Sequence, residues 1–285
     1  MYYFIFEPAA NRKIEKIEEE IKARASELQI DGEFITLSLA EQPESLAKIG
    51  LQKDYHTIIA VGSDALINSV AQGLINQEAA LGAIPLEEDS IFLSLIGVPD
   101  WQEALEILPA RKIELLDSVL LNRRYRFATQ VEIMPPPGKK GVIVLAFDAY
   151  FRAEVTERRI IVSNLGVKLF NKTKVLSAAK DGYLDVFIPG KTELQKKWWQ
   201  VFSQLTSEET ESGSTFHPKF LEINSKLKLR ALINKKVVAN SPFLFEIEPR
   251  TLSFIVKRSK SEEFDDQNSS PATTNHSVGR AESIK

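Results

Sequence analysis

The 285-residue chain has no cysteine and only three histidines, His56, His217 and His276. It therefore has no disulfide and no thiolate ligand for a metal, and three histidines are too few for a histidine-rich metal site. No apolar run approaches the roughly 20 residues that a membrane-spanning helix requires. The formal net charge of −3 argues against a protein that binds nucleic acid.

The opening residues, MYYFIFEP, lack the basic region that begins a signal peptide. Together with the missing cysteines and the missing membrane span, this predicts a cytoplasmic protein. If such a protein meets a membrane, it does so peripherally, from the outside.

The N-terminal part of the sequence alternates between strand and helix patterns. The periodicity over 12–28 is typical of an amphipathic helix. The continuous apolar run TIIAVG, residues 57–62, is typical of a parallel strand that is covered on both faces. A helix over 64–74 and a strand over 81–84 follow. This order predicts an open parallel α/β sheet with helices on both sides, of the kind that binds nucleotides.

From about residue 110 the pattern changes to short strands separated by turn signals, which predicts an antiparallel β-sandwich. One helix over 193–205 interrupts them. We therefore expect an α/β domain over 1–105, a β-sandwich domain over 106–257 and a polar, disordered tail over 258–285.

The strand 57–62 runs directly into Gly62-Ser63-Asp64 and then into a helix. A strand that ends in a glycine turn at a helix N-terminus is a common phosphate-binding arrangement, because free backbone N–H groups point at the anion. The simpler interpretation is a plain connection in which Ser63 or Asp64 caps the helix. The turn has one glycine, whereas most phosphate loops have several.

Six segments, spread over nearly the whole chain before the polar tail, have a recognisable order and spacing. They are FEPAANRK, AVGSDALIN, GAIPLEEDSIFLSLIGVPDWQEAL, RRIIVSN, KDGYLDVFI and NSPFLFEIEPRTLSFIV. In this order they resemble the diacylglycerol kinase and sphingosine kinase family of lipid kinases. That resemblance implies an α/β nucleotide domain followed by a β-sandwich, with ATP and magnesium as cofactors wherever nucleotide binding is retained.

The family motif Gly-Gly-Asp-Gly-Thr-x-Asn corresponds to residues 62–68. The resemblance implies nucleotide contacts at Gly62, Ser63, Asp64 and Asn68, although Asn68 also fits a solvated surface residue. The second glycine of the motif is Ser63 here, and the threonine is Leu66. Without the second glycine, the backbone of the turn can no longer come as close to a phosphate. Without the threonine, the turn also lacks a hydroxyl group that could donate a hydrogen bond.

Two further departures fall on positions that the family uses for chemistry. Its acid/base-assisting Asp corresponds to Ile91, which cannot accept a proton. Its Asp-Gly-Glu turn, with a base for the lipid hydroxyl, corresponds to Asn234, Lys235 and Lys236, and Lys236 is a cation at neutral pH. We therefore assign no catalytic residue.

Three consecutive carboxylates, Glu87, Glu88 and Asp89, precede Ile91 where the family places triphosphate. Carboxylates at this place repel phosphate. They could instead hold a hard cation or favour a helix N-terminus, and the second interpretation is the simpler one. No metal ligand is assigned.

The substitutions at Leu66, Ile91 and Lys236 predict an impaired or inactive member of the family, a pseudokinase that acts as a binding or regulatory module. The alternative is an active ATP-dependent kinase that phosphorylates a diacylglycerol-like hydroxyl. A lipid or a membrane surface is the expected partner, and nucleic acid is not. The sequence leaves the oligomeric state open and allows a homodimer.

Four other features have competing interpretations. KKWWQVF, residues 196–202, suits either a membrane surface or a helix packed on the sandwich, and packing is favoured. Asp181-Gly182 predicts a structural turn. Asn164 is expected to hydrogen-bond within the fold, and His217 is expected to be a satisfied polar group.

Overall fold

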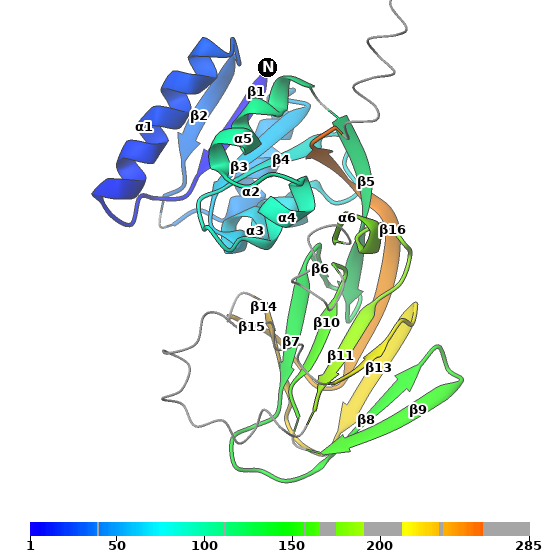
Figure 1. Ribbon diagram of the computed structural model, residues 1–285. Helices are drawn as coiled ribbons and strands as arrows, with labels where there is room; N and C mark the ends of the chain where they lie inside the picture. Colours follow the sequence, from blue (N-terminus) through cyan, green and yellow to red (C-terminus); the bar gives the residue numbers. More distant parts are fainter. Residues whose placement is uncertain are drawn as a thin grey trace, which may run out of the picture.

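The computed structural model describes residues 1–38, 40–110, 112–156, 158–165, 175–190, 213–233 and 236–258. The helix expected over 193–205, the tail after residue 258, Asn234 and Lys235 lie outside these residues. Figure 1 shows an α/β half joined to a β-sandwich half. No helix within the described ranges has the length and hydropathy to cross a bilayer.

The α/β half is built on four parallel strands, as the apolar runs predict. They are β1 (Tyr2–Phe6), β2 (Gly32–Thr36), β3 (Thr57–Gly62) and β4 (Ala80–Pro85). Their order in the sheet is β2-β1-β3-β4. Every residue of β3 and β4 is buried, because both faces of these strands are covered.

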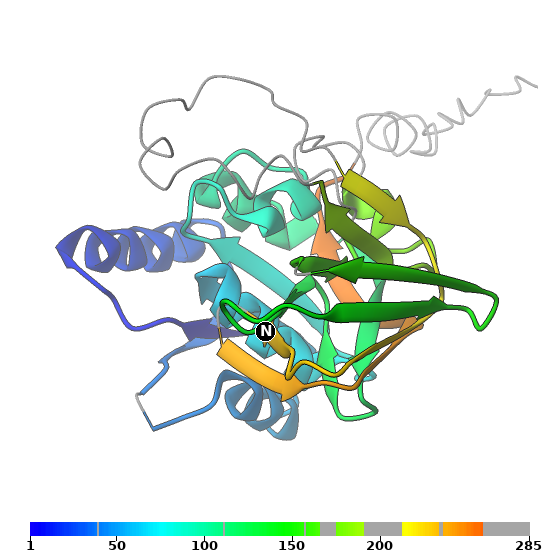
Figure 2. The same ribbon diagram turned by 90° about the horizontal axis from the view of Figure 1, so that it is seen from below.

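Helices cover both faces of this sheet, as predicted. They are α1 (Arg12–Glu27), α2 (Pro43–Gln52), α3 (Asp64–Leu74), α4 (Ile91–Ile96) and α5 (Trp101–Glu106). Alternate residues of β1 enter different core clusters. Tyr3 belongs to the cluster that includes residues of α2, α3 and α4, whereas Phe4 belongs to the cluster that includes residues of α1. Figures 1 and 2 both show α1 on the outer side of this half.

The second half is a sandwich of antiparallel strands, again as predicted. Its strands are β5 (Lys112–Leu121), β6 (Tyr125–Phe127), β7 (Gln130–Met134), β8 (Val142–Phe147), β9 (Phe151–Thr156), β10 (Ile160–Ser163), β11 (Asp185–Pro189), β12 (Gly213–Phe216), β13 (Phe220–Ser225), β14 (Arg230–Ile233), β15 (Lys236–Asn240) and β16 (Phe243–Val256). One face of the sandwich is the six-stranded sheet β12-β11-β10-β7-β14-β15. The other face continues the sheet of the α/β half, in the order β4-β16-β13-β8-β9.

Two long strands belong to both halves. The end of β16 pairs in parallel with β4, through Ser253 and Phe254, while its beginning pairs with β13. β5 runs antiparallel to β16 along nearly its whole length, with a register shift between Glu248 and Leu252. Short helices, Leu108–Ala110 and α6 (Val175–Ala178), lie before β5 and before β11. The division of the chain near residue 105 stays a prediction.

Candidate functional site

The Gly62 turn joins β3 to α3 as the sequence predicts. Ser63 is the N-cap of α3, and its hydroxyl oxygen accepts the N–H of Leu66 at 3.3 Å. Gly62 has a φ of +153°, and a Cβ added there would lie 2.6 Å from the Cβ of Glu7. Glycine is therefore required at this position because another part of the protein approaches its backbone closely.

The group that approaches is the side chain of Glu7, which directly follows β1. Because β1 and β3 are neighbours and end at the same edge of the sheet, Glu7 reaches the turn, and its N–H donates to Val61 O at 2.9 Å. Glu7 Oε2 accepts the N–H of Ser63 at 2.6 Å, and Oε1 accepts the Ser63 hydroxyl at 3.0 Å. The turn does hold an anion, and that anion is a carboxylate of the chain itself.

Asp64, the first residue of α3, faces the loop that follows β4. Its carboxylate accepts the hydroxyl of Ser90 and, at 3.1 Å, the N–H of Ile91. Burial raises the pKa of Asp64, the two hydrogen bonds oppose that rise, and the nearby Glu87 and Asp89 add to it. Asp64 thus fastens the start of α4 to the start of α3.

Glu87 supplies a second carboxylate to the same helix end. Its Oε2 accepts the N–H of Asp64 at 3.3 Å, so Glu87 favours the N-terminus of α3 rather than that of α4. Glu88 and Asp89 are exposed. Among the described residues, no group of three or more His, Asp or Glu side chains is arranged to hold a metal ion.

Asn68 lies elsewhere than the surface position that we expected. Its side chain is 1% exposed, because α3 packs against the connection between β6 and β7. Asn68 Oδ1 accepts the N–H of Ala128 at 3.3 Å, whereas its Nδ2 has no partner among the described residues. The surface prediction is wrong, because sequence spacing does not reveal that the sandwich covers this face of α3.

The Asp181-Gly182 turn is structural, and it rests on a residue that the sequence did not single out. Asp117 of β5 is 1% exposed and accepts the N–H of Gly182 at 2.7 Å and that of Arg250 at 2.8 Å. Asn164, which is fully buried, donates from Nδ2 to Asp117 O at 2.7 Å. Asn164 therefore hydrogen-bonds within the fold, as expected.

The remaining residues named from the sequence are dispersed. His217 is 60% exposed, and its Nδ1 lies 2.9 Å from Oδ1 of the buried Asp185, so it has the polar partner that we expected. Lys236 is exposed at the start of the edge strand β15. Burial raises the pKa of Asp181.

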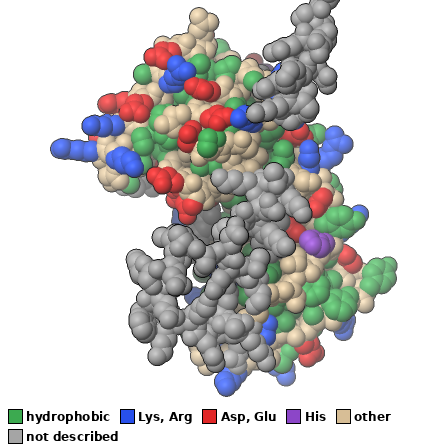
Figure 3. Space-filling view, viewed as in Figure 1, with side chains coloured by type: hydrophobic (Ala, Val, Ile, Leu, Met, Phe, Trp, Pro, Cys, Tyr) green, Lys and Arg blue, Asp and Glu red, His purple; other side chains and the backbone are tan. Residues whose placement is uncertain are grey.

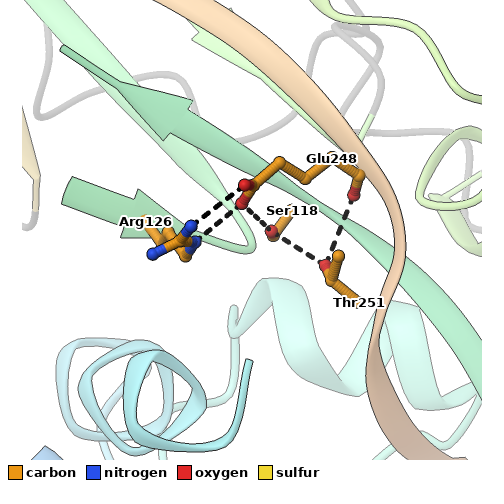
Figure 4. A network of polar contacts seen from close by, with 4 residues as sticks. All are labelled: Ser118, Arg126, Glu248 and Thr251. Atoms are coloured by element: carbon orange, nitrogen blue, oxygen red, sulfur yellow. Dashed lines mark hydrogen bonds and ion pairs between the residues drawn. The ribbon is translucent and has the colours of Figure 1, made fainter. Parts of the chain in front are cut away.

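A polar network that the sequence did not predict lies where β5, β6 and β16 meet (Figure 4). Arg126 makes a two-pronged ion pair with Glu248, at 2.7 and 3.0 Å. The Thr251 hydroxyl donates to Ser118 Oγ at 2.9 Å, and Ser118 Oγ lies 3.5 Å from the Glu248 carboxylate. The carboxylate raises the pKa of Arg126. This network spans the register shift of β16 and so fixes how the strand passes between the halves.

Comparison with known proteins finds one family model that matches in sequence and several solved structures that share the fold. Residues 1–120 match the family model described as the diacylglycerol kinase catalytic domain. A diacylglycerol kinase from Bacillus anthracis str. Sterne superposes with a TM-score of 0.69 at 15% identity, over 90% of this chain and 96% of that one.

An NAD kinase from Archaeoglobus fulgidus, solved in complex with ATP, gives a TM-score of 0.54 at 13% identity. That match covers 95% of this chain and 100% of the other. A search of curated protein sequences finds no match to this chain. The structural likenesses establish the shared fold, with its parallel α/β sheet and its all-antiparallel second sheet.

Proposed function

We propose that this chain, whose residues 1–120 belong to the diacylglycerol kinase catalytic domain family, is a kinase-like protein that does not transfer phosphate and acts as a binding or regulatory module. The observation that carries the proposal is the position of the Glu7 carboxylate, which accepts both the N–H and the hydroxyl of Ser63. A phosphate bound at a turn before a helix N-terminus would accept hydrogen bonds from such backbone N–H and hydroxyl groups. In this chain the N–H and the hydroxyl of Ser63 already donate to Glu7.

The side chains around the turn do not fit a nucleotide triphosphate. Glu7 fills the space beside Gly62, and Glu87 accepts the N–H of Asp64. A phosphate oxygen placed here would meet two carboxylates, and a like-charge pair at about 4 Å costs about 4 kcal/mol at an effective dielectric near 20. The described residues around this turn therefore supply no cradle for a phosphate.

Two other positions support the same proposal. Where the family resemblance places an acid/base-assisting Asp, Ile91 contributes only its N–H, which donates to Asp64. Where the resemblance places a base, the exposed Lys236 carries an ammonium group. Phosphoryl transfer usually requires positioning of the reactants, cations near the phosphates and a base for the attacking hydroxyl. These two substitutions remove the base.

The alternative is an active ATP-dependent kinase acting on a diacylglycerol-like hydroxyl. The match of residues 1–120 to a catalytic domain model favours it, as does the retention of Asp64. Under either function we propose a lipid at a membrane surface as the partner class and a cytoplasmic location, peripheral to that membrane.

The test is the response of the whole chain to nucleotide. We would measure the melting temperature with and without millimolar Mg-ATP, and the transfer of labelled phosphate to diacylglycerol, ceramide and sphingoid lipids. The proposal predicts no ATP-dependent rise in melting temperature and no labelled lipid. Stabilisation by ATP together with lipid labelling that disappears in Asp64→Ala would establish the alternative.

The variant Glu7→Asn shows whether Glu7 is the obstacle, since an amide at this position carries no charge and makes room for an anion. We expect the melting temperature of Glu7→Asn to rise with ATP, as it does for any ligand that binds only the folded state. Glu19→Asn, which neutralises an exposed acid on α1, is the matched control and should not respond.

A further inference from the structure

We propose that the chain forms a symmetric homodimer in which β9 of one copy pairs antiparallel with β9 of a second copy. The ten-stranded sheet ends at β9, which pairs with β8 and has no other neighbour among the described residues. Its outer row of backbone N–H and C=O groups is therefore available to another strand. The inference is independent of whether the protein binds nucleotide.

Both edge strands of the six-stranded sheet carry features that discourage pairing, and β9 does not. β15 begins with Lys236, and its ladder with β14 is broken by a register shift. β12 has four residues and begins at Gly213. β9, with the sequence FRAEVT, has no proline, lysine or glycine, and its ladder with β8 is continuous over six residue pairs. A regular, unprotected edge is the kind that accepts a further strand.

The two faces of β9 differ in chemistry. Ala153 and Val155 are partly buried against the core of the sandwich. The ring of Phe151 stacks on that of Phe216, with centroids 5.8 Å apart, and lies tilted against that of Phe147 at 5.6 Å. Arg152 and Glu154 are exposed on the opposite face. A two-fold axis perpendicular to the sheet relates two antiparallel strands and keeps the same face of both copies on the same side. Residues that lie opposite one another must then point to the same face, so the axis must lie at the level of one residue and not between two consecutive residues.

Only one of the central registers avoids like charges. With the axis at Ala153, Arg152 lies opposite Glu154 of the partner subunit, twice by symmetry, and Phe151 lies opposite Val155 of the partner subunit. Moving the axis to Arg152 or to Glu154 would place that charge opposite its own copy, which destabilises an antiparallel pair. The sequence of β9 is thus self-complementary in one register.

In the same register, the most exposed aromatic residue of the β8–β9 hairpin would contact the partner subunit. Tyr150 is 96% exposed, and with the axis at Ala153 it would lie opposite Thr156 of the partner subunit. A surface hollow of about 320 Å³ lies at that end of β9, lined by Val142, Glu154, Val155, Thr156 and Arg158. In Figure 3 hydrophobic side chains protrude where Figure 1 places the end of the β8–β9 hairpin.

The hairpin end is held in place before any partner arrives. Asp148 Oδ1 accepts the N–H of Lys219 at 3.0 Å and that of Phe220 at 2.8 Å, and the N–H of Tyr150 donates to Phe147 O at 3.0 Å. A preordered edge loses little conformational freedom on pairing, which favours association. Because one strand pair and one aromatic contact bury a small area, we expect a dimer that dissociates on dilution.

Sedimentation velocity on the whole chain over a concentration series would test the proposal. The wild type should pass from monomer to dimer as its concentration rises through roughly the micromolar range that is typical of small interfaces. Arg152→Glu and Glu154→Arg should each stay monomeric, since each places like charges opposite one another. The double variant R152E/E154R restores opposite charges and should dimerise again.

Glu222→Arg is the matched control, because Glu222 is an exposed acid in the interior of the same sheet and should leave the dimer unchanged. Circular dichroism would establish that each variant is folded. A wild type that stays monomeric at every concentration, or a double variant that fails to regain the dimer, would overturn the proposal. Monomers that float with lipid vesicles and lose this binding in Tyr150→Ser would also overturn it, by assigning the hairpin to a membrane.

Discussion

Two glycine turns in this molecule hold a carboxylate from a distant part of the chain, and they do so in different surroundings. At Gly62-Ser63, Glu7 is partly exposed and is bound by one N–H and one hydroxyl. At Asp181-Gly182, Asp117 is 1% exposed and is bound by two N–H groups from different segments. The same chemistry serves both turns.

The two turns differ in whether a ligand could replace the carboxylate that they bind. Asp117 joins β5, the turn before β11 and the register shift of β16, so it belongs to the folded core. Glu7 sits at the C-terminal edge of the parallel sheet, where ligands of such folds bind. The buried carboxylate of Asp117 is a structural tie, whereas the carboxylate of Glu7 lies at the edge where a ligand would compete with it under the proposed function.

The largest expected effect separates these two roles. Asp117→Ala should destabilise the fold by about 3 kcal/mol, because it leaves two partly buried N–H groups without their acceptor and opens a small cavity at the buried position of Asp117. Glu7→Ala should cost only about 1 kcal/mol, because water can replace a partly exposed carboxylate. Urea unfolding of both variants measures the two values. Equal losses would contradict the distinction between the turns.

A second prediction concerns the close approach at Gly62. Gly62→Ala should cost about 3 kcal/mol, since its φ is unfavourable for alanine and its Cβ would overlap Glu7. Gly138→Ala is the comparison, because Gly138 also has a positive φ of +69° but has nothing within 4 Å of an added Cβ. That variant should lose about 1 kcal/mol. If thermal melts show the same loss for both, Glu7 does not crowd Gly62.

The smallest expected effect is a pH dependence at Asp64. Burial raises its pKa in the folded state, so the native protein binds this proton more tightly than the unfolded chain does. This contribution to stability is present at low pH and is lost as the pH rises through the raised pKa. Asp64→Asn cannot ionise, so its stability relative to the wild type should increase from acidic to neutral pH.

Melting curves of both proteins at several pH values would measure this difference. Asp31→Asn, at an exposed position, is the control and should show no such trend. A difference between Asp64→Asn and wild type that does not change with pH would mean that the Asp64 carboxyl titrates alike in the folded and unfolded chains.

Much of the fold could be predicted because it depends on local pattern. The apolar run 57–62 is a buried parallel strand, the helix over 64–74 has the predicted bounds, and the later short strands form an antiparallel sandwich. The family motif also located the turn at Gly62. These features depend on neighbouring residues, which the sequence displays directly.

The contacts that decide what the turn does could not be predicted in this way. Glu7 reaches Ser63 because β1 lies beside β3, and the order of strands in the sheet is not written in either segment. Asn68 is buried because the sandwich covers α3. For Glu7 a signal did exist in the segment FEPAANRK, which resembles the lipid kinase family's Asn-Pro-x-Ser-Gly-x-x-Lys. Glu7 stands where that motif has Asn, and this substitution indicates a change at the turn.

The path of β16 has a consequence for how the protein is made. The last segment of β16 completes the parallel sheet beside β4, and Leu252, Phe254 and Val256 fill the core beneath α3 and α4. The first half of a nascent chain therefore cannot complete its sheet until β16 has left the ribosome. A fragment cut at the end of the catalytic-domain match would lack one wall of its own interior, so both halves should mature and melt together.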